Sequence, residues 1–252
     1  MSKTPPNPTV PLKNPPAQAN QSLQAGIDSL LAIISSDKPI GCKEVAEMLG
    51  TNATRANRLL GTLASMGLAQ RTPQRKYEPG PGLHVLAAMS LHGSRLLKSA
   101  APTIRDLHEA TGHAVALGTL WQGQVCYLYH GAPSRRWEDA LDGATLHPAS
   151  ISSIGRILIA SEDVKEAEAL IRRQPIGEEY SSHEELLADL PIFQKQGFAT
   201  TALGSGSVAV SIGKDRPVAG LALAGAECIP PSDDLINTMK IAAEAIYKRM
   251  TN

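Results

Sequence analysis

The sequence lacks the long apolar runs, paired cysteines and excess charge that mark several broad classes of protein. Its 252 residues contain no stretch of about 18 apolar residues, and residues 1–21 lack the apolar middle segment of a signal peptide. We therefore expect a soluble, cytoplasmic protein that does not enter a membrane. Cys42, Cys126 and Cys228 are scattered, which argues against a disulfide framework and against a cysteine-built zinc site.

Sequence patterns of catalytic and metal sites are also missing. No pair of histidines or cysteines has HxxxH or CxxC spacing. The GSG segment at 204–206 is neither a nucleophile elbow nor a phosphate-binding loop. A lone histidine at a strand end, such as His113, His130 or His147, is more typical of a surface residue than of a metal ligand. We expect no catalytic residues, no metal and no cofactor.

The net charge of zero conceals an uneven distribution. Residues 1–80 carry nine Lys and Arg against five Asp and Glu, a net charge of +4, and residues 81–252 carry the compensating −4. Such a split is typical of a nucleic-acid-binding module joined to a different domain. Residues 1–20 contain six prolines and almost no apolar periodicity, so we expect a disordered tail there.

Apolar residues at helical spacing predict three short helices in residues 21–81. The second helix ends at Gly50, whose access to positive φ suits a tight exit. The third helix, from Thr54 to Leu63, follows after about three residues, and small Ala46 lets the two helices approach closely. This arrangement is a helix-turn-helix.

Polar side chains on the third helix and in the segment behind it suit contact with DNA. Residues 68–70 and 76–78 predict a hairpin, which would form the wing of a winged helix-turn-helix. Basic and hydrogen-bonding side chains recognise phosphates and base edges. The candidate DNA-binding residues are Thr51, Asn52, Thr54, Arg55, Asn57, Arg58, Arg71, Arg75 and Lys76. A module of this kind also binds proteins, so a protein-interaction adaptor is an alternative.

Residues 44–83, EVAEMLGTNATRANRLLGTLASMGLAQRTPQRKYEPGPGL, resemble the winged helix-turn-helix of IclR-type bacterial transcriptional regulators. The resemblance lies in Gly50, Arg58 to Leu60, Leu63, Met66 to Leu68, Tyr77, Gly80 and Leu83. It implies a DNA-binding domain at 21–81, a linker helix at 82–98 and an effector-binding domain at 99–252. The family's linker helix helps to pair subunits. The resemblance therefore implies a homodimer, or a dimer of dimers, on double-stranded promoter DNA.

Residues 99–252 alternate helical and strand patterns. A helix is expected at 102–110, a hairpin at 113–130, and three helical runs at 154–160, 164–173 and 183–196. Strands follow within 197–225, and a last helix spans 233–250. This order predicts an α+β domain in which helices pack against an antiparallel sheet.

Residues 143–161, GATLHPASISSIGRILIAS, are similar to the effector-pocket segment of the same family, whose GAF-like domain binds a small molecule. Arg156 stands where the family usually has Lys. Positions that carry hydroxyls in relatives binding small hydroxy or keto acids fall on alanines here, so we expect a more apolar pocket. The resemblance implies the effector-binding residues Pro148, Ser150, Ser152, Ser153, Gly155, Ser207, Ser211, Ala222 and Ala224. Serines in short segments also serve as caps and turn residues.

Overall fold

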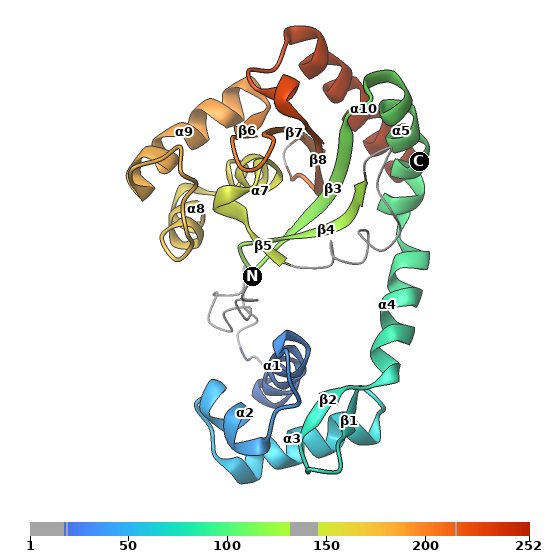
Figure 1. Ribbon diagram of the computed structural model, residues 1–252, viewed down its shortest axis with the longest axis vertical. Coiled ribbons are helices and arrows are strands. Elements are labelled where there is room, and N and C mark those ends of the chain that lie inside the picture. Colours follow the sequence, from blue (N-terminus) through green and yellow to red (C-terminus); the bar gives the residue numbers. More distant parts are fainter. Residues whose placement is uncertain (1–17, 19, 132–145, 215) are drawn as a thin grey trace. The chain divides into compact units, whose positions relative to one another are not determined.

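The computed structural model describes residue 18 and residues 20–131, 146–214 and 216–252 (Figure 1). The chain divides into two compact units, Met1–Ser94 and Arg95–Asn252. The tail expected at 1–20 falls almost wholly outside the described residues, as does Gly143 of the pocket segment.

The first unit contains the three expected helices and the wing. These are α1 (Gln21–Ser35), α2 (Cys42–Met48) and α3 (Ala53–Ser65), followed by the antiparallel pair β1 (Ala69–Arg71) and β2 (Tyr77–Pro79). Each strand begins one residue later than the sequence pattern predicted. Apolar residues from all of these elements form one core, namely Ile33, Ile40, Val45, Ala46, Ala56, Leu60, Leu63, Ala69 and Tyr77. Gly50 has a φ of 58°, the left-handed conformation expected for the turn.

Helix α4 (Pro81–Gly93) differs from the linker helix expected at 82–98. Pro81 occupies the first turn, where its missing N–H costs no helical hydrogen bond. The helix ends at Gly93 because Ser94 is extended, with a ψ of 112°. Glycine and serine are weak helix formers, which favours a break at this point. Residues 95–98 belong to the next helix, α5 (Arg95–Thr111), which also includes Pro102 in its interior.

The second unit is built on a six-stranded antiparallel sheet with the order β5-β4-β3-β8-β7-β6. The central hairpin and the last three strands were predicted, whereas β5 was not. The strands are β3 (Ala114–Trp121), β4 (Gln124–Gly131), β5 (Leu146–Pro148), β6 (Ala199–Thr201), β7 (Ser207–Ile212) and β8 (Ala219–Ala224).

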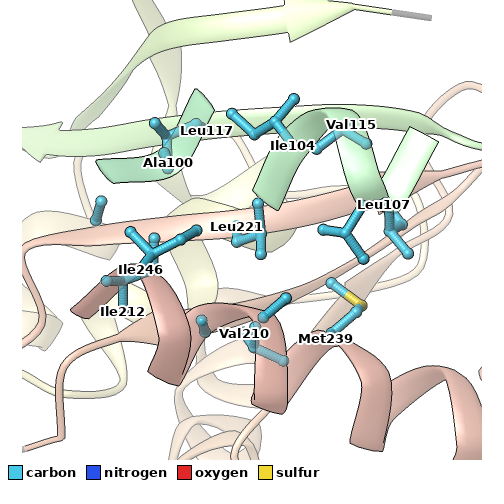
Figure 2. Packing of buried hydrophobic residues seen from close by; sticks show 14 of the residues in the cluster. Ala100, Ile104, Leu107, Val115, Leu117, Val210, Ile212, Leu221, Met239 and Ile246 are labelled. Carbon is cyan, nitrogen blue, oxygen red and sulfur yellow. The ribbon is translucent and has the colours of Figure 1, made fainter. Parts of the chain in front are cut away.

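Helices cover both faces of this sheet, so the predicted α+β class is confirmed (Figure 1). One face packs against α5 and α10 (Asp233–Thr251), and their side chains interlock in Figure 2 around Leu117, Leu221 and Met239. The other face packs against α7. The next two helices along the chain, α8 and α9, lie on the same side as α7. The helices of that side are η2 (Ala149–Ile151), α7 (Ser153–Ile159), α8 (Val164–Ile171) and α9 (His183–Gln196). No helix in the described ranges is long and apolar enough to cross a membrane.

Helix α7 lies close to the sheet because glycines face it. A Cβ atom on Gly220 would lie 2.7 Å from Cγ2 of Ile154, and one on Gly118 would lie 3.5 Å from Cδ1 of Ile154. Gly155 faces the preceding turn, where a Cβ would lie 2.2 Å from the carbonyl oxygen of Ala149. Because these positions have no Cβ atom, the start of α7 can pack closely between η2 and the sheet.

Candidate functional site

Helix α3 presents a polar face at the surface of the first unit. Asn52 caps its N-terminus by accepting a hydrogen bond from the Arg55 amide at 2.8 Å. Thr54, Asn57 and Arg58 are exposed, and Arg55 is partly exposed. The first turn contains no acidic residue. The helix start therefore offers donors and positive charge to an anion.

The wing carries two exposed arginines. The guanidinium of Arg71 lies over the ring of Tyr77, 5.9 Å from its centroid, within the range of a cation–π interaction. Arg75 occupies the turn with a φ of 60°, a conformation that strains any residue with a Cβ. Both side chains are exposed to solvent.

Lys76 is less available than these arginines. Its ammonium lies 3.5 Å from a carboxylate oxygen of Glu44, which also accepts a hydrogen bond from the Gly41 amide. The Gly41 hydrogen bond and the charge of Lys76 both lower the pKa of Glu44, although partial desolvation opposes them. Lys76 thus has a partner within its own unit.

Apolar side chains are exposed on two helices of the first unit. Helix α4 has no buried residue, and at least half of the surface of Val85, Leu86, Met89 and Leu91 is exposed. Leu23 on α1 is 62% exposed. Large apolar groups at this density are typical of a surface that another protein covers.

The second unit contains a cavity of about 240 Å³ on the α7 side of the sheet. Its lining comes from β3, β4, β5 and β8, from η2 and the start of α7, and from the end of β6, the start of β7 and the segment between them. The lining residues are Ala116, Tyr127, His130, His147, Ile151, Ser152, Ser153, Thr201, Leu203, Gly204, Ser205, Gly206, Ser207, Ala222 and Ala224. The alanine methyl groups of the central strands make one wall apolar, and the serines make another polar.

Two pairs of hydroxyl groups lie among these lining residues. The hydroxyl of Tyr127 is 3.1 Å from Oγ of Ser152, and Oγ of Ser153 is 2.7 Å from Oγ of Ser207. Each pair uses one hydroxyl hydrogen internally, which leaves the other hydroxyl able to donate outward. A ligand in the cavity would find both donors and acceptors there.

Aromatic and imidazole rings form a further wall of the cavity. The Tyr127 ring stacks on His130 at a centroid distance of 5.6 Å and meets the edge of His147 at 5.1 Å. Burial lowers the pKa of His147, so its imidazole is neutral near pH 7. Burial also raises the pKa of Tyr127, although the hydrogen bond with Ser152 opposes this. These rings suit the face or edge of a small planar ligand.

Five of the nine expected effector-binding residues line this cavity, namely Ser152, Ser153, Ser207, Ala222 and Ala224. The other four, Pro148, Ser150, Gly155 and Ser211, do not. Ser150 is fully buried, and its hydroxyl lies 3.1 Å from Oε1 of Gln174, to which it donates. Gly155 instead allows α7 to approach the Ala149 turn, as described above. Pro148 ends β5, and Ser211 lies within β7.

A β-bulge in β4 brings two of the rings to the same wall of the cavity. Tyr127 and His130 are three residues apart, and a regular strand would place them on opposite faces. The register between β3 and β4 shifts at Leu117 and Gly118, which adds one residue to β4. Both rings therefore line the same cavity, and no alternation in the sequence signals this.

A larger hollow of about 530 Å³ lies along α5 and β4. It is lined by Leu97, Ala101, Ile104, Arg105, His108, Glu109 and Tyr129 and contains none of the expected effector residues. Within this lining, Nε2 of His108 lies 2.9 Å from the Tyr129 hydroxyl. Within the described ranges, no group of three or more His, Cys, Asp or Glu side chains is arranged to hold a metal ion. We place the candidate site in the smaller cavity, where the expected residues converge.

The family model for the bacterial transcriptional regulator IclR C-terminal domain matches residues 88–214, about half of the chain. The chain belongs to the IclR family. The matched range contains the cavity-lining residues from Ala116 to Ser207, while Ala222 and Ala224 lie beyond it.

Curated relatives in this family are regulators. KdgR of Dickeya chrysanthemi, an HTH-type transcriptional regulator, is 24% identical over 174 residues, which cover 67% of this chain and 57% of KdgR. The glycerol operon regulatory protein of Streptomyces coelicolor is 26% identical over 151 residues, which cover 60% of this chain and 59% of that protein. The matched part thus spans less than two thirds of either relative.

Solved structures of the family share the fold over nearly the whole chain. An IclR family transcriptional regulator from Brucella abortus has a TM-score of 0.76 at 21% identity, covering 97% of this chain and 98% of that one. An IclR homologue from Microbacterium hydrocarbonoxydans in complex with 4-hydroxybenzoate has a TM-score of 0.66 at 19% identity, covering 91% and 99%.

Proposed function

We propose that this protein is a ligand-responsive, DNA-binding transcriptional regulator that acts in the cytoplasm by binding and not by catalysis. The observation that carries the proposal is the exposed polar face of α3, capped by Asn52 and flanked by the Arg71 and Arg75 wing. The same chain carries an IclR C-terminal domain with an internal cavity.

In this proposal α3 enters the major groove of an operator. Arg55 and Asn57 read base edges, and Arg58 divides its contacts between bases and phosphates. Thr51, Asn52 and Thr54 lie at the helix start, next to the backbone that the helix crosses. Arg71 and Arg75 hold phosphates, with Lys76 contributing less because of its pairing with Glu44.

The exposed apolar faces of α4 and α1 support a homo-oligomer. A dimer buries Val85, Leu86 and Met89, which water contacts in the single chain. Two α3 helices then meet successive major grooves of a roughly palindromic site. A dimer of dimers extends the same arrangement.

The cavity between α7 and the sheet is the proposed effector site. Its volume of about 240 Å³ suits a ligand smaller than a drug molecule. Tyr127, His130 and His147 supply ring contacts, and the serines supply hydrogen bonds. The relative in complex with 4-hydroxybenzoate makes small hydroxylated aromatic compounds the first class to test.

Two measurements test the proposal. A duplex enriched from random DNA by the protein should bind with an affinity that falls steeply with salt, by roughly 0.9 log units per log unit of salt for each phosphate contacted. DNA binding whose affinity does not change with salt concentration, or the absence of DNA binding, would favour a protein-interaction adaptor. A metabolite that occupies the cavity should raise the melting temperature, and Ala222→Leu should abolish that rise while leaving DNA affinity unchanged.

A further inference from the structure

Arg156 is a buried cation at the centre of the second unit. Its side chain is only 2% exposed, and its Nε donates to the Ser150 carbonyl oxygen at 2.7 Å. Nη1 donates to Oε1 of Glu179 and to the Thr200 carbonyl oxygen, each at 2.7 Å. The guanidinium lies 4.9 Å from the Tyr180 ring centroid. Three segments far apart in the sequence therefore meet at one side chain.

Glu179 continues this network to the cavity. The same Oε1 atom that pairs with Arg156 accepts from the Ala202 amide at 3.3 Å. It shares the Thr201 hydroxyl hydrogen with the Ile151 carbonyl oxygen, and each of these two acceptors lies 3.1 Å from Oγ1 of Thr201. Thr201 Oγ1 in turn accepts from the Leu203 amide at 3.3 Å, and the Gly206 amide donates to the Leu203 carbonyl oxygen. Residues 201–206, which we call the cavity wall, all line the cavity except Ala202.

We propose that Arg156 and Glu179 form a positioning pair that holds the cavity wall in the geometry required for ligand binding, although neither residue lines the cavity. This inference rests on the proposed function, because it takes the cavity as the effector site. The pair acts on a ligand only through Thr201 and the backbone of the wall.

A charged pair suits this role better than an apolar contact. Burying an ion pair costs desolvation energy, and apolar residues of similar size often stabilise a domain as well or better. Hydrogen bonds from a guanidinium are directional, however, and charge assistance makes them stronger than neutral ones. They fix where the carboxylate lies, and the carboxylate fixes the Thr201 hydroxyl and the Ala202 amide.

The surrounding chain leaves space for the pair. A Cβ atom on Gly177 would lie 2.8 Å from Nη2 of Arg156 and 2.7 Å from Cδ of Glu179. Any larger residue at position 177 would displace one of the two side chains. Gly177→Ala is therefore a way to disturb the pair without altering either charge.

Hydrogen exchange of the full-length protein tests the proposal without a ligand. Loss of the charge-assisted hydrogen bonds in Glu179→Ala should speed exchange of the Ala202 and Leu203 amides by at least about tenfold. Removal of Glu179 also leaves the buried Arg156 unpaired and lowers the free energy of unfolding, which a urea titration measures in parallel. After subtraction of that global loss, amides of β8, such as those of Leu221 and Leu223, should stay within about twofold of the wild type. Gly177→Ala should also speed hydrogen exchange of the Ala202 and Leu203 amides.

Glu184→Gln is the matched control. Glu184 pairs with Arg172 at 2.8 Å on the exposed side of the same unit, and neither residue lines the cavity. This variant removes one carboxylate charge from an exposed Arg–Glu pair that has no contact with the cavity wall, so exchange in the wall should not change.

The pH dependence gives a second readout. Burial acts to raise the pKa of Glu179, but hydrogen bonds from Arg156 and from backbone amides outweigh it and lower the pKa below its usual value. The other groups facing it are Tyr180 and, through the Tyr180 hydroxyl, Asp189 of α9. After correction for intrinsic rates, protection of Ala202 should persist as the pH falls through the ordinary carboxyl range and decrease only at lower pH, where Glu179 becomes protonated. In Glu179→Gln, which has no carboxylate at this position, protection of Ala202 should no longer change over this pH range.

Two results would overturn the positioning role. Equal acceleration of the wall and of β8 would show that the pair only stabilises the domain, and unchanged wall exchange in Glu179→Ala would show that it does not hold the wall. A wild-type protein that neither binds DNA nor responds to any metabolite would instead count against the proposed function. The exchange result would not depend on that outcome.

Discussion

Arg75 and Lys76 are adjacent in the wing and carry the same charge, yet the structure predicts different contributions to DNA binding. Arg75 is exposed, whereas the Lys76 ammonium lies 3.5 Å from Glu44. A dimer presents two wings, so Arg75→Ala should remove two phosphate contacts. At about 0.9 per contact, the slope of log affinity against log salt should fall in magnitude by about 1.8.

Lys76→Ala should lower that slope by less than half as much, because Glu44 already competes with phosphate for the ammonium. Glu44→Gln should raise the slope, since it frees Lys76 while its amide oxygen still accepts from Gly41. Fluorescence anisotropy with a labelled duplex at several salt concentrations measures all three variants. Equal losses for Arg75→Ala and Lys76→Ala would refute the assignment.

Backbone strain at position 75 does not confuse this comparison. Arg75 has a φ of 60°, and alanine suffers the same conflict between Cβ and the backbone. Arg75→Gly relieves that strain, by about 1 kcal/mol, while it removes the same phosphate contact. It should therefore combine the slope of Arg75→Ala with a more stable wing. A glycine variant with the wild-type slope would show that the wing backbone, and not the guanidinium, meets DNA.

Three further predictions follow from the packing and the polar surface. Arg55→Ala should weaken binding to the enriched duplex by about 1–3 kcal/mol and binding to random duplexes much less, and equal losses in a competition assay would remove it from the base-reading set. Gly220→Ala should lower the free energy of unfolding by about 1–3 kcal/mol in urea titrations, because its Cβ would meet Ile154, and a neutral result would contradict the close approach of α7. Met89→Glu should shift the sedimentation coefficient toward that of the monomer, because Met89 is 67% exposed in the single chain and the proposed dimer buries it. Glu47→Gln on α2 provides a surface control. An unchanged dimer would place the interface elsewhere.

The fold of the first unit followed from local sequence signals. The helix-turn-helix depends on apolar spacing, on Gly50 at positive φ and on the Asn52 cap, and each of these acts within a few residues. The linker helix was placed less well because its end at Ser94 is set by one extended residue. Leu96 and Leu97 continue the apolar pattern of the helix, and this pattern outweighed the break that the weak helix formers Gly93 and Ser94 favour.

The cavity was only partly predictable because its walls depend on contacts between distant segments. Ser152, Ser153 and Ser207 were expected from resemblance, and they lie together because Gly118 and Gly220 let α7 approach the sheet. The bulge in β4 places Tyr127 and His130 on one face, which no periodic pattern encodes.

The burial of Arg156 also could not be predicted from the local sequence. A basic residue next to Gly155 in a short amphipathic segment has the sequence pattern of a solvated helix position, yet it is among the most deeply buried large side chains of the described chain. Its burial is possible only because partners from positions 150, 179 and 200 converge on it, and these are up to 44 residues away in the sequence. A buried charge is costly unless such partners are fixed in advance. In the proposed role of the pair, the shape of the cavity depends on these long-range polar contacts as well as on the residues that line it.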